Sequence, residues 1–541
     1  MHVVMERIRR CEVSEKEWRW ALAWAAVILA VSCLPYLVVW IATPSGYQFG
    51  GILVNPLDGN SYLAKMRQGW AGSWQFHLTY TPEPHDGARI VYLFYLGLGH
   101  VARWTGLPLI VVYHAARVLG GLALLIAVYR FLIRLTNDCR ERRLAFWLVG
   151  TAAGLGWLGA ALGAFPIDLW VPEAFAFFSL LTNPHFPLAL ALMLIIITSM
   201  VWPVCGVWRW LSPGLAALAL ALVHPLALAP VYATLALYLL LRGWFDRSWL
   251  LSGLTTAVGV ALFSAPVLLY GYWIYVASPA LAAWAAQNVT PAPSILNLAL
   301  GYGLVGLLAI AGGVMVARGR GRDWPAPGVQ VQGGGLALLA WTLGTLALVY
   351  VPFALQRRFL TGLGLPLAML AALGLSRCLL PRLPDGWARR AVALAVGFSA
   401  LGNLFLLMVL TLGALSRQGQ SELFARLYLS QDEVAAMQWL LDHAQDEVVL
   451  ASPRTGMFLP GRAGVRVFVG HPFETIDAKT KEAQAEAFFR GEMSAGEWQA
   501  FRERYRIHYV FVGPAERALG GGDRLDELEP LFRQGEVTIY R

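Results

Sequence analysis

Long apolar segments dominate this chain and decide the solvent in which it can fold. Residues 19–43 form one apolar run, and dense apolar runs resume near residue 108 and continue to about residue 415. Hydrophobic residues make up 57% of the 541 residues and charged residues only 14%, more apolar surface than a soluble globular domain needs. The sequence therefore predicts a polytopic α-helical protein that crosses a lipid bilayer many times.

The apolar segments divide into about eleven spans when each crossing is given about 20 residues. Several of these segments are short or contain a proline, as at Pro225, Pro266 and Pro366. Such interruptions are tolerated where protein or a watery cavity satisfies the freed backbone groups. We expect spans at about residues 19–43, 108–133, 144–164, 186–201, 213–224, 226–242, 249–272, 297–317, 336–355, 359–379 and 389–415.

Basic residues, which give the chain a net charge of +9, gather at the ends of the apolar segments. This pattern follows the positive-inside rule and argues against a nucleic-acid partner. It predicts a multi-pass protein of the cell membrane (inner or plasma membrane), with residues 1–18 in the cytoplasm and residues 416–541 outside. The clusters placed in the cytoplasm contain Arg7, Arg9, Arg10, Lys16, Arg134, Arg140, Arg142, Arg143, Arg242, Arg247, Arg318, Arg320, Arg322, Arg382, Arg389 and Arg390.

A polar, aromatic-rich loop, residues 44–106, separates the first span from the others. It contains the sequence NPLDGNSYLAKMRQGW, and its residues 60–71 and 89–103 predict helices. The second helix is too short and too punctuated to cross a bilayer, which favours a position in the membrane interface. We therefore expect one transmembrane domain over residues 19–415 that carries this loop on its outer side.

Residues 416–541 have the polarity of a domain that folds outside the membrane. The apolar runs VVLAS, VRVFVG, IHYVFVG and VTIY alternate with helical segments, which predicts a small α/β domain with a mainly parallel sheet. Ser430 and Ser494 mark helix starts, and Glu497 completes a capping box. The loops Gly470–Pro472 and Gly513–Arg517 follow strands, where α/β domains bind ligands, but turn chemistry explains them equally well. No G-x-G-x-x-G motif follows a strand, so no nucleotide is expected.

Asp58 is the first candidate for chemistry, because it lies in the polar loop between Pro56 and Gly59. A carboxylate in this place can act as a general base, or can hold an acceptor hydroxyl or a metal ion. The simpler interpretation is that Asp58 caps a helix beginning near Asn60, because Asp is a favoured N-cap residue. The two roles do not exclude each other.

Arg357 and Arg358 precede a late span on the expected outer face, where the positive-inside rule disfavours arginine. A pair of guanidinium groups can bind a phosphate or pyrophosphate through parallel hydrogen bonds. The alternative is that both reach toward the lipid headgroups. Lys65 and Arg67, which follow Asp58 in the loop, have the same two interpretations, as ligands of a donor phosphate or as residues that face headgroups.

Two histidines and two loop carboxylates complete the candidates for a cavity. His185 and His224 lie where predicted helices break near the outer face, and polar residues at that depth are usually functional or paired. Each can also be a satisfied group at a helix end. Glu83 and Asp86 could supply a second acid or a metal ligand, without D-x-D spacing, and the five cysteines are isolated. A divalent metal therefore stays open, with no ligands assigned. Further outer-face carboxylates are Asp168 and Glu173.

The order of these segments resembles the C-type membrane glycosyltransferase superfamily (GT-C), which includes the protein O-mannosyltransferases and the aminoarabinose transferases. The resemblance covers residues 19–415 and lies in a first span, a long outer loop with an early Asp, and an amphipathic segment. The sequences YTPEPHDGARIVYLFYLGLGHVARWTG, QRRFLTGLGLPLAMLAALGL and RYRIHYVFVGPAER also resemble segments of this superfamily. The resemblance implies a polyprenyl-phosphate sugar donor, and it places Asp58 at the loop Asp that is the catalytic base.

One expected function and two alternatives follow. We expect a hexosyl- or pentosyltransferase, embedded among membrane lipids, that moves a sugar from a polyprenyl-phosphate donor to an extracytoplasmic lipid, glycan or protein acceptor. A secondary transporter also has broken helices and a polar site at the midplane, but the spans show no internal repeat and few ionisable residues. A noncatalytic scaffold for envelope assembly that has kept the fold is the second alternative.

Overall fold

The computed structural model describes residues 14–245, 247–319, 329–384, 386–416, 421–520, 525 and 527–541. Within these residues, eight helices are long and apolar enough to cross a membrane, and three shorter apolar helices accompany them. Each predicted span has a helix at its position, which confirms a multi-pass α-helical membrane protein. The orientation of the termini stays a prediction. Some of the arginines that it uses, Arg7, Arg9, Arg10, Arg320 and Arg322, lie outside the described residues.

The chain folds into two compact units, each built from several segments. The first, here called the helical unit, contains Met1–Leu34, Ala116–Leu268 and Thr290–Val409. The second, here called the mixed unit, contains Pro35–Ala115, Leu269–Val289 and Leu410–Arg541. The mixed unit therefore joins the polar loop after the first span with the α/β segment at the end of the sequence.

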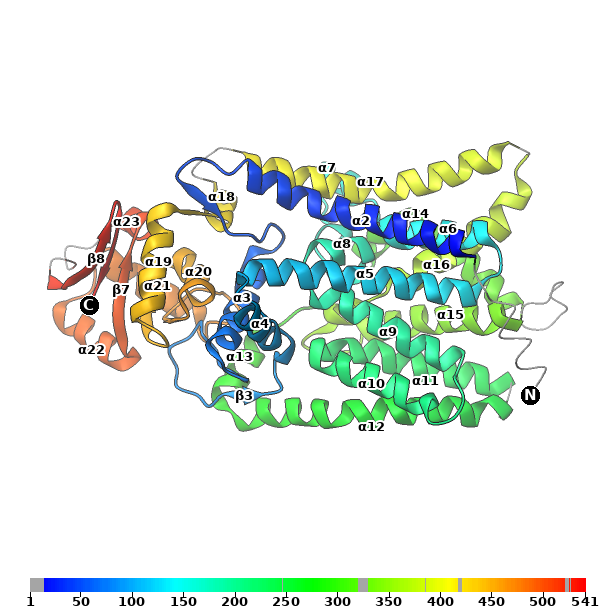
Figure 1. Cartoon of the computed structure of the whole chain (residues 1–541), viewed down its shortest axis with the longest axis horizontal. Helices are drawn as coiled ribbons and strands as arrows, with labels where there is room; N and C mark the ends of the chain where they lie inside the picture. The colour runs from blue at the N-terminus through cyan, green and yellow to red at the C-terminus, as the bar shows by residue number, and fades with distance from the viewer. Residues whose placement is uncertain are drawn as a thin grey trace. The chain divides into compact units, whose positions relative to one another are not determined.

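Helices form nearly all of the helical unit (Figure 1). Four of the five boundaries between the units fall inside α2, α5, α12 and α17, and the fifth lies between residues 289 and 290, after α13 (Pro279–Gln287). Its long helices are α2 (Glu15–Ile41), α5 (Leu109–Leu135), α6 (Cys139–Thr151), α9 (His185–Val201), α10 (Trp208–Val223), α11 (Leu228–Phe245), α12 (Arg247–Ala277), α14 (Ile295–Arg318), α15 (Val329–Val349), α16 (Gly364–Gly374) and α17 (Trp387–Leu415). Its short helical turns are α7 (Gly156–Ala161), η1 (Ile167–Leu169), η2 (Pro172–Ala174), α8 (Ala176–Leu181), η3 (Pro225–Ala227), η4 (Gln356–Leu360), η5 (Leu375–Leu379) and η6 (Leu380–Arg382).

Glycine allows α14 and α16 to approach each other closely. A Cβ atom at Gly312 would lie 2.0 Å from the carbonyl oxygen of Leu370, and one at Gly374 would lie 2.3 Å from that of Leu308. Helices in a membrane associate through such small residues, because lipid provides no hydrophobic drive between them. The contact therefore depends on the absence of side chains at both glycines.

The mixed unit contains the strands of the structure together with shorter helices. Its first part comprises β1 (Tyr47–Phe49), α3 (Pro56–Ala71), β2 (Gln75–Phe76), β3 (Ala88–Arg89), α4 (Leu93–Thr105) and α13 (Pro279–Gln287). Its C-terminal part comprises α18 (Glu422–Leu427), β4 (Tyr428–Ser430), α19 (Gln431–His443), β5 (Val448–Leu450), α20 (Pro453–Ala463), β6 (Arg466–Val467), α21 (Ala478–Phe489), α22 (Ala495–Tyr505), β7 (Ile507–Val512), α23 (Pro514–Leu519), β8 (Pro530–Gln534) and β9 (Val537–Tyr540). β1 pairs with β4, and β2 pairs with β3.

A five-stranded sheet with the order β6-β5-β7-β9-β8 forms the centre of the C-terminal part. Val449 and Phe511 join the hydrophobic core beneath α19 and α20, whereas Val448 and Val510 join the core beneath α21 and α22, so helices cover both faces (Figure 1). This confirms the small α/β domain. The sheet is mixed rather than mainly parallel: β6, β5 and β7 are parallel, but a tight turn at Gly535 makes β8 and β9 an antiparallel hairpin.

The two helices predicted in the polar loop are present as α3 and α4, which contact each other at their backbones. A Cβ atom at Gly69 of α3 would lie 2.0 Å from the carbonyl oxygen of Leu96, and one at Gly99 of α4 would lie 2.0 Å from that of Met66. α3 begins at Pro56, earlier than predicted. The close contact with α4 fixes the direction in which the remaining faces of α3 point.

Candidate functional site

Asp58 lies in the first turn of α3 and is not its N-cap residue. Pro56 stands in this first turn, where its missing N–H costs nothing, and Asn55 takes the N-cap position. The φ of Asn55 is 48°, a left-handed value that Asn tolerates better than most residues. The interpretation of Asp58 as a helix cap is therefore wrong, although a carboxylate in the first turn still interacts favourably with the helix dipole.

Two nitrogen atoms approach the carboxylate of Asp58, one at each oxygen. The side-chain amide of Asn55 donates to Oδ2 at 2.5 Å, and Nε2 of His471 lies 3.4 Å from Oδ1. The side chain of Asp58 is 30% exposed, whereas that of His471 is 2% exposed. The carboxylate is thus held from within the protein and stays accessible from outside.

Ser61 and Lys65, on the turns of α3 that follow Asp58, form a buried polar cluster with Glu474. Nζ of Lys65 donates to Oε1 of Glu474 at 2.8 Å and to Oγ of Ser61 at 2.5 Å, and Ser61 donates to the same carboxylate oxygen. Burial raises the pKa of Glu474, but the electrostatic influence of Lys65 and His471 and the hydrogen bonds from Lys65 and Ser61 outweigh it, so the net pKa is lowered. Glu474 is therefore ionised at neutral pH.

Aromatic rings surround the ammonium group of Lys65. Its Nζ lies 4.4 Å from the ring centroid of Tyr92, 5.4 Å from that of Tyr62 and 5.5 Å from that of Phe76, distances at which a cation is attracted to an aromatic face. Lys65 points into protein, where it already has a carboxylate partner. Its role in binding a donor phosphate stays a prediction, and this geometry favours a structural charge.

A tight loop after β6 carries both His471 and Glu474. The N–H of Gly470 donates to Oγ1 of Thr475 at 3.2 Å, and the N–H of Thr475 donates to the carbonyl oxygen of His471 at 2.8 Å. Gln287, at the end of α13, donates to the carbonyl oxygen of Thr475 at 2.8 Å. These bonds fix the loop, and hence the position of the His471 ring.

Arg67 points away from Lys65, because residues two apart on a helix differ in direction by about 200°. Its Nε donates to the carbonyl oxygen of Gly461 in α20 at 3.2 Å. Burial, and then the charge of Arg462, lower the pKa of Arg67 to about 10. The structure thus separates the two basic residues that the sequence grouped, and a donor-binding role for Arg67 stays a prediction.

The two other loop carboxylates have different surroundings. Glu83 forms a salt bridge with Lys481 of α21 and accepts a hydrogen bond from Thr81. Burial lowers the pKa of Lys481, and the hydrogen bond and charge of Glu83 act against this lowering. Glu83 therefore connects the polar loop to the C-terminal part of the mixed unit. Asp86 is exposed, and a role for either residue as an acid or a metal ligand stays a prediction.

No group of three or more His, Cys, Asp or Glu side chains within the described part of the chain is arranged to hold a metal ion. Asn55 and His471 present nitrogen atoms to the carboxylate of Asp58. These surroundings suit a carboxylate that accepts hydrogen bonds, and we assign no chemical step to a metal.

In the helical unit, two predicted histidines lie side by side. His185 begins α9 and His224 ends α10, and their ring centroids are 5.2 Å apart. Both residues are buried, at 3% and 9% exposure, and the charge of Arg358 acts on His224. The structure therefore places three of the predicted residues in one region of this unit.

The two predicted arginines in η4 have different partners, both from the helical unit. Nη1 of Arg358 lies 3.3 Å from Oε1 of Glu173, a carboxylate that is only 2% exposed. The guanidinium carbon of Arg357 lies 5.0 Å from the ring centroid of Trp170. Arg358 is therefore paired with a carboxylate, and the guanidinium group of Arg357 lies over an aromatic ring. Both arginines and both histidines belong to the helical unit, whereas Asp58 belongs to the mixed unit.

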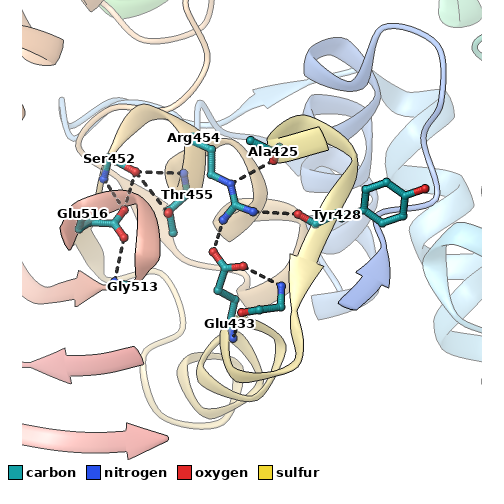
Figure 2. A network of polar contacts seen from close by, with 9 residues as sticks. Ala425, Tyr428, Glu433, Ser452, Arg454, Thr455, Gly513 and Glu516 are labelled. Carbon is teal, nitrogen blue, oxygen red and sulfur yellow. Dashed lines mark hydrogen bonds and ion pairs between the residues drawn. The ribbon is translucent and has the colours of Figure 1, made fainter. Parts of the chain in front are cut away.

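The loops at the carboxyl ends of β5 and β7, where an open α/β sheet commonly binds ligands, are closed by the chain itself. Glu516, in the first turn of α23, is 0% exposed. Its Oε1 accepts the N–H of Ser452 at 2.9 Å and the hydroxyl of Ser452 at 2.5 Å, and its Oε2 accepts the N–H of Gly513 at 2.9 Å (Figure 2). An internal carboxylate therefore fills the place of an anionic ligand at these two helix starts.

Figure 2 also shows a second closed network, which fixes the segment before α19. Arg454 forms an ion pair with Glu433, and it donates to the carbonyl oxygens of Ala425 at 3.0 Å and of Tyr428 at 2.8 Å. The network joins α18, β4, α19 and α20.

No role for Ser61 or Glu474 was predicted from the sequence, and the loop Gly470–Pro472 was predicted either to bind a ligand or to form a turn. A signal was present, because His471 and Glu474 are titratable residues in the loop that directly follows a buried strand run. Nothing local could show that this loop meets α3, since Ser61 and Glu474 are separated by 413 positions.

Comparisons with known proteins define the fold. No protein-family model matches the chain, and no curated protein matches it by sequence. Among solved structures, ArnT from Cupriavidus metallidurans bound to undecaprenyl phosphate is similar, with a TM-score of 0.55 and 13% identity over 96% of this chain and 98% of that chain. The apo oligosaccharyltransferase of Archaeoglobus fulgidus has a TM-score of 0.51 and 15% identity, over 91% of this chain and 69% of that chain.

Both of these proteins are GT-C superfamily glycosyltransferases. The chain described here therefore has the GT-C membrane fold, as the order of its segments predicted, and it carries a small C-terminal α/β domain. At this level of identity the similarity establishes the fold, and the chemistry has to be argued from the residues of this chain.

Proposed function

We propose that this protein is a membrane glycosyltransferase that transfers a sugar from a polyprenyl-phosphate donor to an extracytoplasmic lipid, glycan or protein acceptor. The observation that carries the proposal is the carboxylate of Asp58, which is held at both oxygens and 30% exposed. Solved examples of the fold support it, since one of them is bound to undecaprenyl phosphate.

Asp58 acts as the general base in this proposal. It takes the proton of the acceptor hydroxyl while the acceptor oxygen forms a bond to the anomeric carbon of the sugar. The bond between that carbon and the phosphate oxygen breaks, and the polyprenyl phosphate leaves with the electron pair. Each carboxylate oxygen has two lone pairs, so Asp58 can accept from the substrate while Asn55 and His471 hold it.

Arg357 and Arg358 stabilise the departing phosphate in this proposal. Negative charge develops on the phosphate as the sugar leaves, and preorganised cations are most effective at such a position. Arg357 lies over the ring of Trp170, which preorganises its guanidinium group, and Arg358 lies 3.3 Å from Glu173. His185 and His224, which lie beside each other near Arg358, would line the cavity that holds this phosphate.

The direct test is transfer by the purified protein in lipid, with a panel of polyprenyl-phosphate sugars and radiolabelled product as readout. Asp58→Asn keeps the shape of the side chain and an acceptor oxygen, but it removes the charge that accepts a proton. Transfer should fall on the order of 100-fold or more, while the variant folds normally. Full transfer by Asp58→Asn would refute the mechanism, and uptake of an unmodified solute into vesicles without transfer would support a transporter instead.

Arg357→Lys separates charge from geometry at the phosphate site. Lysine keeps the positive charge but loses the planar fork and the stacking on Trp170. We expect partial activity, reduced roughly 10-fold, and a larger loss in Arg357→Ala. Equal activity of Arg357→Ala and wild type would remove this residue from the mechanism.

A further inference from the structure

His471, in the loop after β6 of the C-terminal α/β domain, lies against the carboxylate of Asp58. Its Nε2 lies 3.4 Å from Oδ1, and within the described residues this buried atom has no hydrogen-bond partner, so the contact with Asp58 is a close approach without the geometry of a hydrogen bond. The distance is longer than an ordinary hydrogen bond. Such contacts are often long without substrate and tighten in the reacting complex.

The surroundings of the ring determine which nitrogen carries the proton. Nδ1 of His471 accepts the backbone N–H of Phe473 at 3.2 Å. A nitrogen that accepts a hydrogen bond cannot carry the ring proton, so the neutral ring is protonated at Nε2. The N–H bond of His471 is therefore on the side of the ring that faces Asp58.

The charged and titratable groups around His471 come from three elements of the mixed unit. Asp58 and Lys65 belong to α3, Glu474 belongs to the same loop as His471, and the ring of Tyr80 lies 5.7 Å away between centroids. Lys65 is already paired with Glu474. Glu474 acts on His471 through its charge, whereas Oδ1 of Asp58 lies 3.4 Å from Nε2 of His471.

We infer that His471 is a positioning residue for Asp58, so that the C-terminal α/β domain completes the catalytic centre formed by α3. The inference rests on the proposed function of Asp58. His471 donates to Oδ1 and holds the carboxylate in one rotamer together with Asn55, and the second lone pair of each oxygen stays available for the acceptor proton. His471 itself exchanges no proton with the substrate.

Three substitutions at His471 separate this role from simple packing. His471→Phe keeps a ring of similar size but has no donor. His471→Gln places an amide N–H about where Nε2 lies, and the shorter His471→Asn does not reach that position. We expect kcat to fall roughly 10-fold or more in the Phe and Asn variants, with little change in KM, and to stay near wild type in the Gln variant.

A double-mutant cycle tests whether His471 acts through Asp58. In the Asp58→Asn background, His471→Phe should cause no further loss of transfer. Equal losses in both backgrounds would overturn the inference, and so would equal activities of the Gln and Asn variants. If Asp58→Asn is inactive while His471→Phe is fully active, the inference fails and the proposed base stands. If Asp58→Asn is fully active, the proposed function fails and takes the inference with it.

The same cycle can be read without any substrate, as the midpoint of thermal unfolding of the full-length protein in lipid or detergent. A direct contact predicts that His471→Phe shifts the midpoint less in the Asp58→Asn background than in the wild-type background, and equal shifts in both backgrounds would contradict it. His508→Phe is the matched control, because His508 faces a different carboxylate, Glu447, at 2.8 Å and is 44% exposed. It should leave transfer unchanged.

Discussion

Asp58 and Glu516 occupy the same kind of position, the first turn of a helix in the mixed unit, but their surroundings differ. Glu516 is completely buried, and backbone and hydroxyl donors of Ser452 and Gly513 satisfy both of its oxygens (Figure 2). Asp58 accepts a hydrogen bond from Asn55 and lies 3.4 Å from Nε2 of His471, and almost a third of its side chain is exposed. The carboxylate of Glu516 thus stabilises the fold, whereas the carboxylate of Asp58 is accessible for chemistry.

Glu474 stands between these two extremes. It is nearly buried, like Glu516, but its partner is a charged lysine instead of neutral donors. Stability and activity should therefore respond differently to the loss of each carboxylate. Variants at Asp58, Glu474 and Glu516 test this expected difference.

The largest effect on stability is expected at the buried ion pair. Lys65→Met leaves Glu474 buried without its cation, which should lower the free energy of unfolding by about 3–5 kcal/mol. The double variant Lys65→Met/Glu474→Gln should recover much of this loss, because no buried charge remains. Chemical unfolding followed by tryptophan fluorescence measures both. A single variant as stable as wild type would show that the pair is not buried as described.

Glu516→Gln should destabilise the α/β domain without a direct effect on transfer. The Gln side chain has one acceptor oxygen in place of two, and its NH₂ group would face an N–H donor, so we expect a loss of about 2–3 kcal/mol. Transfer per folded molecule should equal that of wild type. Loss of transfer at unchanged stability would instead place a ligand at the carboxyl ends of β5 and β7.

The pH dependence of stability gives a smaller effect that isolates Glu474. Its folded-state pKa is lowered from the ordinary value of 4.5, so the ion pair contributes fully above that value. The contribution is lost as the pH falls through the lowered folded-state pKa. Unfolding midpoints measured from neutral pH downward should fall more steeply for wild type than for Lys65→Met/Glu474→Gln. Parallel curves would contradict the assignment.

Hydropathy and local capping signals were sufficient to predict much of the fold from the sequence. Apolar length predicted the spans, and the capping box of Ser494 with Glu497 correctly marked the start of α22, as Ser430 marked that of α19. These features depend on residues close together in sequence. The pairing of β1 with β4 was not predicted, because the two strands are far apart in the sequence and each has only three residues.

The candidate site was predicted only in part, and for a physical reason. Asp58 was found because an acidic residue in a polar loop after a span stands out locally. Its partner His471 and the neighbouring Glu474 come from a loop about 400 positions later, and that contact exists only in the folded chain. Lys65 and Arg67 looked equivalent in sequence, whereas helical geometry sends one toward Glu474 and the other toward Gly461.

We propose that the exposed carboxylate of Asp58 performs the chemistry and that the buried carboxylate of Glu516 supports the structure. The most direct measurement is the rate of sugar transfer by Asp58→Asn and by Glu516→Gln, each divided by the amount of folded protein. We predict a loss on the order of 100-fold or more for Asp58→Asn at an unchanged unfolding midpoint, and wild-type transfer for Glu516→Gln at a lowered midpoint. Wild-type transfer by Asp58→Asn would contradict the account.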